Sequence, residues 1–115
     1  MKKLLLAPLF LLASCAPILQ TVQQEPATLA RDAGALLFIN SGTETAEAPA
    51  LLLSGNIETT DPNCSKRPSG RIGCAIQDVP PGQQYRLVYT GTLEAATVTF
   101  YKASTGTRPI YLQLP

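Results

Sequence analysis

The sequence predicts an all-β fold, either a sandwich or a barrel. Apolar and polar residues alternate with a period of two along much of the chain, which is the spacing that turns one face of a strand toward a core. Gly, Pro, Asn and Ser separate these runs at short intervals, as they do in sandwiches and barrels. Apart from the first apolar segment and the stretch 43–48, no window has the apolar stripe of an amphipathic helix.

The expected strands begin with a short one near Thr28–Arg31. Leu36–Ile39 is a compact apolar run that ends at the turn residues Asn40-Ser41-Gly42, and Ala50–Leu53 is a second such run. Asp61–Gly70 is expected to form a loop because it is rich in Pro, Asn, Ser and Gly.

The alternation is clearest in the second half of the chain, where Thr, Val, Tyr and Ile suit a pleated surface with one buried face. Turns are expected at Pro80-Pro81-Gly82 and Ser104-Thr105-Gly106, and Thr90-Gly91 is expected to end a strand. The residues expected to face the core form four sets: Ile72, Cys74 and Ile76; Tyr85, Leu87 and Tyr89; Ala96, Val98 and Phe100; Ile110, Leu112 and Leu114.

The N-terminal segment predicts export. Met1-Lys2-Lys3 precedes an apolar run, Leu4–Leu12, and small residues then precede Cys15, which is the order found in secretory signals. The run is interrupted by Pro8 and is shorter than the ~20 apolar residues of a membrane-spanning helix. A plain secreted protein and an uncleaved anchor are the alternatives.

Leu12-Ala13-Ser14-Cys15 resembles the lipobox of bacterial lipoproteins. The resemblance implies that the signal peptide 1–14 is removed and that Cys15 becomes the first residue, with a diacylglycerol on its sulfur and a further acyl chain such as palmitate. Ala16 stands where an Asp would retain such a protein in an inner membrane. The expected location is therefore the cell envelope, at the outer membrane or the cell surface, with the membrane as a partner through the lipid.

Processing at Cys15 would leave a lipidated tether, 15–27, and one domain, 28–115. The tether contains Gln20, Gln23 and Pro26 and is expected to be flexible. Loss of the two leading lysines leaves seven Lys and Arg against eight Asp and Glu, a formal charge of −1. That balance argues against nucleic acid as a partner, because nucleic-acid binders carry a basic face.

Cys64 and Cys74 predict a disulfide, because paired cysteines in an exported domain are normally oxidised. Closing a loop of this size should stabilise the fold by about 3 kcal/mol in the chain-entropy model. A metal pair and a catalytic dithiol are the alternatives. A zinc site needs four ligands and the sequence has no His, and the Cys-x-x-Cys spacing of a dithiol is missing.

The middle of the chain carries a second resemblance. Phe38-Ile39-Asn40-Ser41-Gly42-Thr43-Glu44-Thr45-Ala46, then Cys64, then Ile72–Ile76, then Val79–Gln83 resemble the Ig-like repeats of bacterial surface proteins called domain of unknown function 11 and CARDB-type modules. The resemblance implies a small seven-stranded Greek-key β-sandwich with no catalytic residue. Those modules usually recur in tandem, whereas this chain has one.

Two groups of side chains are candidate binding residues. Lys66, Arg67 and Arg71 form a basic cluster that could bind an anion, such as a lipid phosphate or an acidic wall polymer, because Arg presents a planar donor fork; a merely solvated loop is the alternative. Tyr101 and Tyr111 are expected to be exposed and could contact a sugar. A cross-strand pair that only stabilises the sheet is the alternative for the tyrosines.

No residue pattern points to catalysis, to a metal or to a cofactor. A serine nucleophile needs a base, and the sequence has no His to serve as one. Glu44 with Glu47, and Glu58 with Asp61, lack the alternating ligand spacing of a calcium loop.

We therefore expect a non-enzymatic, membrane-anchored envelope lipoprotein that acts as an interaction or structural module for an envelope protein or polymer. The last strand, which ends at Leu112-Gln113-Leu114-Pro115, is the expected sheet edge for docking. The alternative is a ligand-binding lipoprotein that recognises an anionic or saccharide component of the envelope.

Overall fold

The computed structural model of this protein describes residues 26–115. The expected signal peptide, the lipidation site Cys15 and nearly all of the expected tether lie outside the described residues. Within residues 26–115, no helix is both long enough and apolar enough to cross a membrane. The elements are β2 (Ala27–Arg31), β3 (Ala35–Asn40), β4 (Glu47–Glu58), β5 (Cys64–Lys66), β6 (Ile72–Ala75), β7 (Gln84–Val88), β8 (Thr90–Tyr101), the 3-10 turn η3 (Ala103–Thr105) and β9 (Ile110–Gln113).

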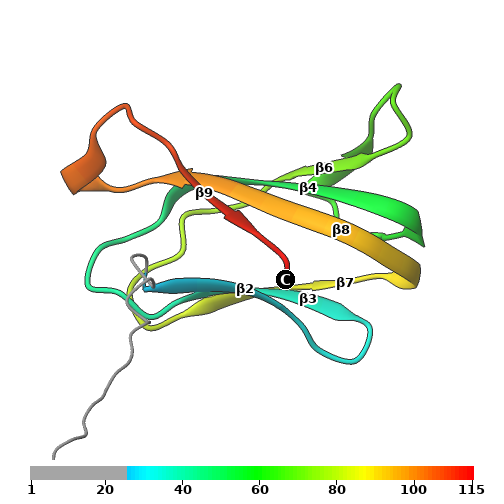
Figure 1. The fold of residues 1–115 in the computed structure, drawn as a ribbon, viewed down its shortest axis with the longest axis horizontal. Coiled ribbons are helices and arrows are strands. Elements are labelled where there is room, and N and C mark those ends of the chain that lie inside the picture. Colours follow the sequence, from blue (N-terminus) through cyan, green and yellow to red (C-terminus); the bar gives the residue numbers. More distant parts are fainter. Residues whose placement is uncertain (1–25) are drawn as a thin grey trace, which may run out of the picture.

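The strands form two antiparallel sheets that lie face to face (Figure 1). One sheet has three strands in the order β2-β3-β7, and the other has five in the order β5-β6-β4-β8-β9. The long strands β4 and β8 pair with each other through the centre of the larger sheet. The all-β prediction is confirmed, and the architecture is sandwich-like.

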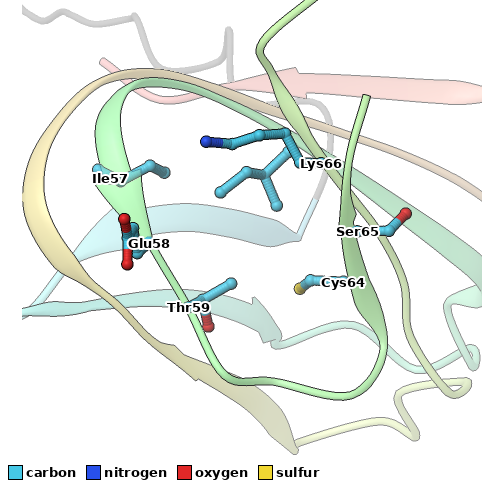
Figure 2. Close-up of a pocket in the computed structure, with 7 residues that line it drawn as sticks. Ile57, Glu58, Thr59, Cys64, Ser65 and Lys66 are labelled. Atoms are coloured by element: carbon cyan, nitrogen blue, oxygen red, sulfur yellow. The ribbon is translucent and has the colours of Figure 1, made fainter. Parts of the chain in front are cut away.

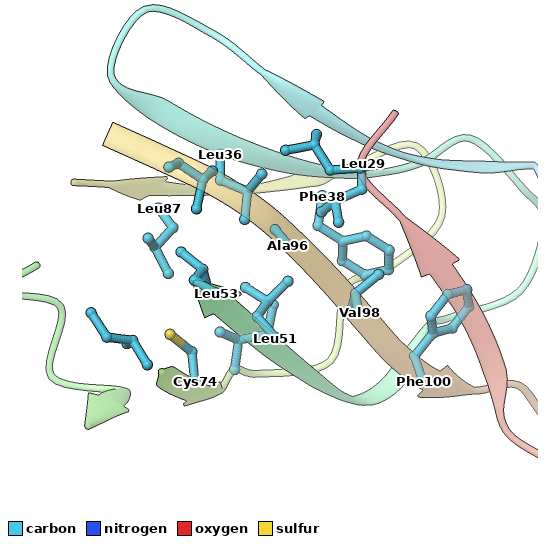
Figure 3. Packing of buried hydrophobic residues seen from close by; sticks show 14 of the residues in the cluster. Leu29, Leu36, Phe38, Leu51, Leu53, Cys74, Leu87, Ala96, Val98 and Phe100 are labelled. Carbon is cyan, nitrogen blue, oxygen red and sulfur yellow. The ribbon is translucent and has the colours of Figure 1, made fainter. Parts of the chain in front are cut away.

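The core lies between the two sheets and is built from the period-two positions of the sequence. The buried face of the smaller sheet includes Leu36, Phe38 and Leu87, and that of the larger sheet includes Val98 and Phe100 (Figure 3). The rings of Phe38 and Phe100 meet across the sandwich with their centroids 5.1 Å apart and their planes inclined at 55°. This is a tilted arrangement of the kind that aromatic pairs favour.

The disulfide prediction is also confirmed. Cys64 on β5 lies directly opposite Cys74 on β6, and their sulfur atoms are bonded. Cys74 belongs to the core, with 3% of its surface exposed. The bond therefore ties the outermost strand of the larger sheet to a buried position.

Three segments differ from the sequence-based expectation. The loop expected over Asp61–Gly70 contains the short strand β5, which pairs with β6. Thr90-Gly91 does not end a strand but begins β8, where Gly91 lies opposite Ile57. Gly91 has φ of 96°, and a side chain there would collide with the backbone oxygen of Asn56, so glycine permits this close approach of the two strands. The stretch 43–48, which has helical spacing, forms bends and the start of β4.

Asn40 joins three segments of the backbone at the end of β3. The side chain is 4% exposed, and its amide nitrogen donates to the carbonyl oxygens of Glu44 at 2.8 Å and Val79 at 2.9 Å. Its side-chain oxygen accepts from the backbone nitrogen of Gly42 at 3.0 Å. The residue that the sequence marked only as a turn former is therefore the buried polar group that joins the loop after β3 to the loop before β7.

We expect Asn40→Ala to lower the free energy of unfolding by about 2–3 kcal/mol, because buried polar groups that lose their partners cost roughly 1–3 kcal/mol. Equilibrium urea unfolding would measure the change. Asn56→Ala, at an exposed position of β4, is the matched control and should stay within about 0.5 kcal/mol of the parent. Equal effects of the two substitutions would contradict this role of Asn40.

Candidate functional site: the outer face of the five-stranded sheet

The β5–β6 hairpin divides the three basic residues between the two sides of the sheet. Lys66 lies opposite Ile72, whose side chain is buried on the core side, so Lys66 shares that side. Arg67 lies on the other side, because a side chain added at Gly73 would collide with the Arg67 guanidinium. The turn between β5 and β6 is closed by a hydrogen bond from the backbone nitrogen of Arg67 to the backbone oxygen of Arg71 at 2.7 Å. The structure therefore does not bring Lys66, Arg67 and Arg71 together in one patch.

Lys66 lines a hollow of about 190 Å³ between the end of β4 and the hairpin (Figure 2). Glu58 lines the same hollow, together with Ile57, Thr59 and the disulfide residue Cys64. The wall thus holds one cation and one anion, so its charge is balanced. This balance makes the hollow a poor site for a charged ligand.

The outer face of the five-stranded sheet is the surface that points away from the core. Its strand positions follow from the register: Leu52 lies opposite Gly73 and Thr97, and Thr97 lies opposite Gln113. The central positions of this outer face are Ala50, Leu52, Ser54, Gly73, Ala75, Ala95, Thr97, Thr99, Tyr111 and Gln113. None of these residues carries a charge, and most are small. Charged side chains lie around them, with the Arg67 guanidinium over Gly73 and Glu47 opposite Tyr101.

A hollow of about 270 Å³ lies on this outer face. The residues lining it are Leu52, Ser54, Arg71, Ala95, Ala96, Thr97, Tyr111, Gln113 and Leu114. The structure therefore brings together Arg71 and Tyr111, which belong to the two separate groups of candidate residues. Figure 1 shows that the β5–β6 and β8–β9 connections rise on the outer side of the sheet at its opposite ends.

The two tyrosines differ in their surroundings. Tyr111 is 60% exposed and lies opposite Thr99, whereas Tyr101 is half-buried and lies opposite Glu47 on β4. The tyrosines are thus diagonal neighbours on adjacent strands rather than a directly opposed pair. Only Tyr111 lines the hollow on the outer face.

β9 is an edge strand of the larger sheet, as predicted. The Leu114 nitrogen donates to the Ala96 oxygen at 2.9 Å. Backbone groups alternate in direction along an antiparallel strand, so those of Tyr111 and Gln113 point to the open edge. On the smaller sheet, the hydroxyl of Thr59 donates to the Val88 oxygen of edge strand β7 at 2.8 Å and covers part of that edge.

Glu44 has a structural role at the end of the sandwich. Its carboxylate accepts from the Ser104 hydroxyl at 2.8 Å and from the Ser104 backbone nitrogen at 2.9 Å. These two hydrogen bonds lower the pKa of Glu44, because they favour the charged form. Within residues 26–115, no three His, Cys, Asp or Glu side chains gather as a metal site would need.

Tyr85 joins β7 to the loop that follows β4. Its hydroxyl donates to the Asp61 carboxylate and accepts from the Asn63 side-chain amide at 3.2 Å. Burial, followed by the hydrogen bond to Asp61, raises the pKa of the Tyr85 phenol, because both disfavour the phenolate.

We expect Tyr85 to make stability depend on alkaline pH. An ordinary phenol ionises near pH ~10, so the unfolded chain loses this proton before the folded chain does. The stabilisation is complete below that pH and disappears as the pH rises through the higher folded pKa. Tyr85→Phe should remove this dependence in thermal unfolding followed from neutral to strongly alkaline pH. Equal losses of thermal stability with rising pH in the parent and in Tyr85→Phe would contradict the attribution of this pH dependence to Tyr85.

Comparisons of the chain with protein-family models, with curated proteins and with solved structures find no match. The resemblances to lipoproteins and to Ig-like surface modules therefore stay predictions from the motifs. Four lining residues, Leu52, Ser54, Thr97 and Gln113, were not singled out from the sequence. For Leu52, Thr97 and Gln113 the available signal was their place on uncharged positions of the expected strands. Ser54 lies beyond the expected strand Ala50–Leu53, whereas β4 continues through it to Glu58.

Proposed function

We propose that this chain is a non-catalytic, lipid-anchored envelope domain that docks a partner through the outer face of its five-stranded sheet. The observation that carries the proposal is the absence of charged residues at the central strand positions of that face, around a tyrosine that is 60% exposed. Binding surfaces are depleted of charge and enriched in tyrosine at their centre. The side of an antiparallel sheet that only meets water is polar, whereas this face includes the apolar residues Ala50, Leu52, Ala75 and Ala95.

The anchor in this proposal is Cys15 of the Leu12-Ala13-Ser14-Cys15 lipobox. One acyl chain binds a membrane only marginally, so a diacylglycerol with a further chain is the form that would hold the domain in place. A flexible segment of the tether's length has an end-to-end distance of about 20 Å. The domain would thus stay close to the outer membrane or the cell surface.

The relation to Ig-like Greek-key sandwiches belongs to the same proposal. β3 lies between β2 and β7, and β8 lies between β4 and β9. In the immunoglobulin sandwich the second strand likewise lies between the first and the fifth, and the sixth between the third and the seventh. The hairpin β5–β6 is an added pair of strands beside β4.

The absence of catalysis is proposed on the chemistry of the side chains. The sequence has no His to act as a base. Two acidic side chains are already engaged, Glu44 by Ser104 and Asp61 by Tyr85. The proposed interaction with an envelope protein or polymer therefore depends on where the lipid anchor holds the domain and on the surface that the domain presents.

Photocrosslinking in whole cells would test the docking face. A photoreactive phenylalanine analogue at Tyr111 should give a defined adduct with an envelope component. The matched control is the same analogue at Val88, which is also 60% exposed but lies on the smaller sheet. Adducts from position 88 alone, or equal adducts from both positions, would overturn the proposed face.

We expect Cys15→Ala to release the protein from membranes. The substitution removes the sulfur that would carry the diacylglycerol, so the hydrophobic anchor is lost. Cell fractionation with metabolic palmitate labelling should show the label in the parent protein and its loss in the variant. Substitution of Ser65, an exposed residue beside the disulfide, by Ala is the control and should leave both the label and the fractionation unchanged.

A second candidate function, the binding of an anionic or saccharide component, is favoured by one specific observation. Arg71 and Tyr111 line a single hollow on the outer face, which provides a charged donor and an aromatic ring in one place.

A further inference from the structure

We propose that the hollow on the outer face binds a pyranose that carries a carboxylate, as a single unit of an acidic glycan. This inference rests on the proposed function, since it takes the outer face as the binding surface and names the chemistry of its ligand. It follows from the charge, the aromatic ring, the polar lining and the size of the hollow, which are taken in turn.

The charge of the hollow comes from one residue. Arg71 is the single ionic side chain among its lining residues. In the described part of the chain the only salt bridge joins Arg86 to Asp32, so Arg71 is not neutralised by a carboxylate. A guanidinium fork matches a carboxylate with two parallel hydrogen bonds. A monoanion is therefore the charge that the hollow can balance.

The aromatic surface comes from Tyr111. Its neighbours across the strands are Thr99 and, on the next strand, Ala50, which are small enough to leave the ring 60% exposed. A tyrosine ring offers an apolar face together with a polar hydroxyl. One face of a pyranose presents C–H groups, which can pack against such a ring while the sugar hydroxyls stay directed at polar atoms.

The remaining lining suits a polyhydroxylated ligand. Ser54 and Thr97 provide hydroxyls, and Gln113 provides an amide, so the wall holds both donors and acceptors. Leu52 and Ala95 give it apolar contacts. The volume of about 270 Å³ lies just below the range of pockets for drug-sized ligands, ~300–1,000 Å³. One sugar ring, with part of a second, would fill it.

Phosphate is less well matched than a carboxylate. A phosphate dianion would need more than one cation, and neither of the other two basic residues of the hairpin lines the hollow. Lys66 lies on the core side of the sheet. The Arg67 guanidinium lies over Gly73, which is opposite Leu52 at the border of the hollow.

Nuclear magnetic resonance titration of the full chain would test the inference. The chain is kept in a detergent without sugar headgroups, and glucuronic acid, methyl glucoside and inorganic phosphate are added at equal concentrations. Glucuronic acid should shift the amide signals of Leu52, Thr97 and Gln113 in a saturable way. Methyl glucoside should bind more weakly, and phosphate should not shift these three signals.

Two variants separate the contributions of charge and ring. Arg71→Gln should weaken glucuronic acid binding by about tenfold and should leave methyl glucoside unchanged, since a hydrogen bond to a charged group is worth roughly this factor. Tyr111→Ala should weaken both sugars. Arg108→Gln, at an exposed position on the β8–β9 connection, is the matched control and should change neither. Thermal unfolding of each variant shows that it is folded.

Four results would overturn the inference. The first three are no saturable shift with glucuronic acid, shifts confined to the smaller sheet, and equal affinity of the parent and Arg71→Gln for glucuronic acid. The fourth is phosphate binding at the same signals with equal affinity, because the carboxylate would then not be selected. A defined photoadduct from position 111 alongside any of these results would leave the proposed function standing with a different ligand.

Discussion

Phe100→Ala is expected to lower the free energy of unfolding by about 3–5 kcal/mol, which is the usual cost of truncating a buried phenylalanine. Phe100 is 1% exposed and lies on β8 of the larger sheet, where its ring meets that of Phe38 from the smaller sheet. Its removal would leave a cavity between the two sheets. Equilibrium urea unfolding would measure the effect, provided that the free energy of unfolding depends on urea concentration with the same slope in the parent and the variant.

The same position offers controls for the packing between the sheets. Phe100→Leu keeps most of the volume and should cost clearly less than Phe100→Ala. A double-mutant cycle with Phe38→Leu and Phe100→Leu should give a coupling of about 0.5–1.5 kcal/mol, the range for aromatic pairs in contact. A coupling of zero, or a Phe100→Ala variant as stable as the parent, would mean that the two sheets do not pack as described.

Loss of the disulfide is expected to cost about 3 kcal/mol, within the range of 2–5 kcal/mol for small exported domains. The bond joins Cys64 on the edge strand β5 to Cys74 in the core. Without it, the hairpin is no longer restrained in the unfolded chain, and β5 keeps only three residues with which to pair. The double variant Cys64→Ala with Cys74→Ala should show the loss in urea unfolding.

Chemical reduction of the parent protein is the matched test of the same bond. The reduced parent and the double alanine variant should unfold at similar urea concentrations, since both lack the cross-link. Reduction that leaves the unfolding midpoint unchanged would show that the two thiols are not bonded in the purified protein.

The strands with strict alternation could be predicted from the sequence, because their pattern comes directly from burial. Ala96, Val98 and Phe100 were expected on one face, and all three are at most 1% exposed. β5 could not be predicted this way, because Cys64-Ser65-Lys66 has no apolar alternation and pairs through its backbone and the disulfide. The start of β8 at Thr90-Gly91 was also missed, since a glycine that allows close approach has the same local signal as a turn glycine.

The candidate site was only partly predictable. The sequence places Lys66, Arg67 and Arg71 within six positions, but the register of the hairpin sends Lys66 to the core side of the sheet. Tyr111 was expected to be exposed from its phase alone, and it is. That it shares a hollow with Arg71 depends on the strand order β5-β6-β4-β8-β9, which pairs strands far apart in the sequence and leaves no local signal.

The most direct test of a lipid-anchored envelope domain is mass spectrometry of the N-terminal peptide of the protein isolated from its native cells. We predict a peptide that begins at Cys15 and carries the added mass of a diacylglycerol and a further acyl chain. A peptide in which Cys15 is internal, or in which its thiol is free, would contradict the anchor and with it the proposed position of the domain at a membrane.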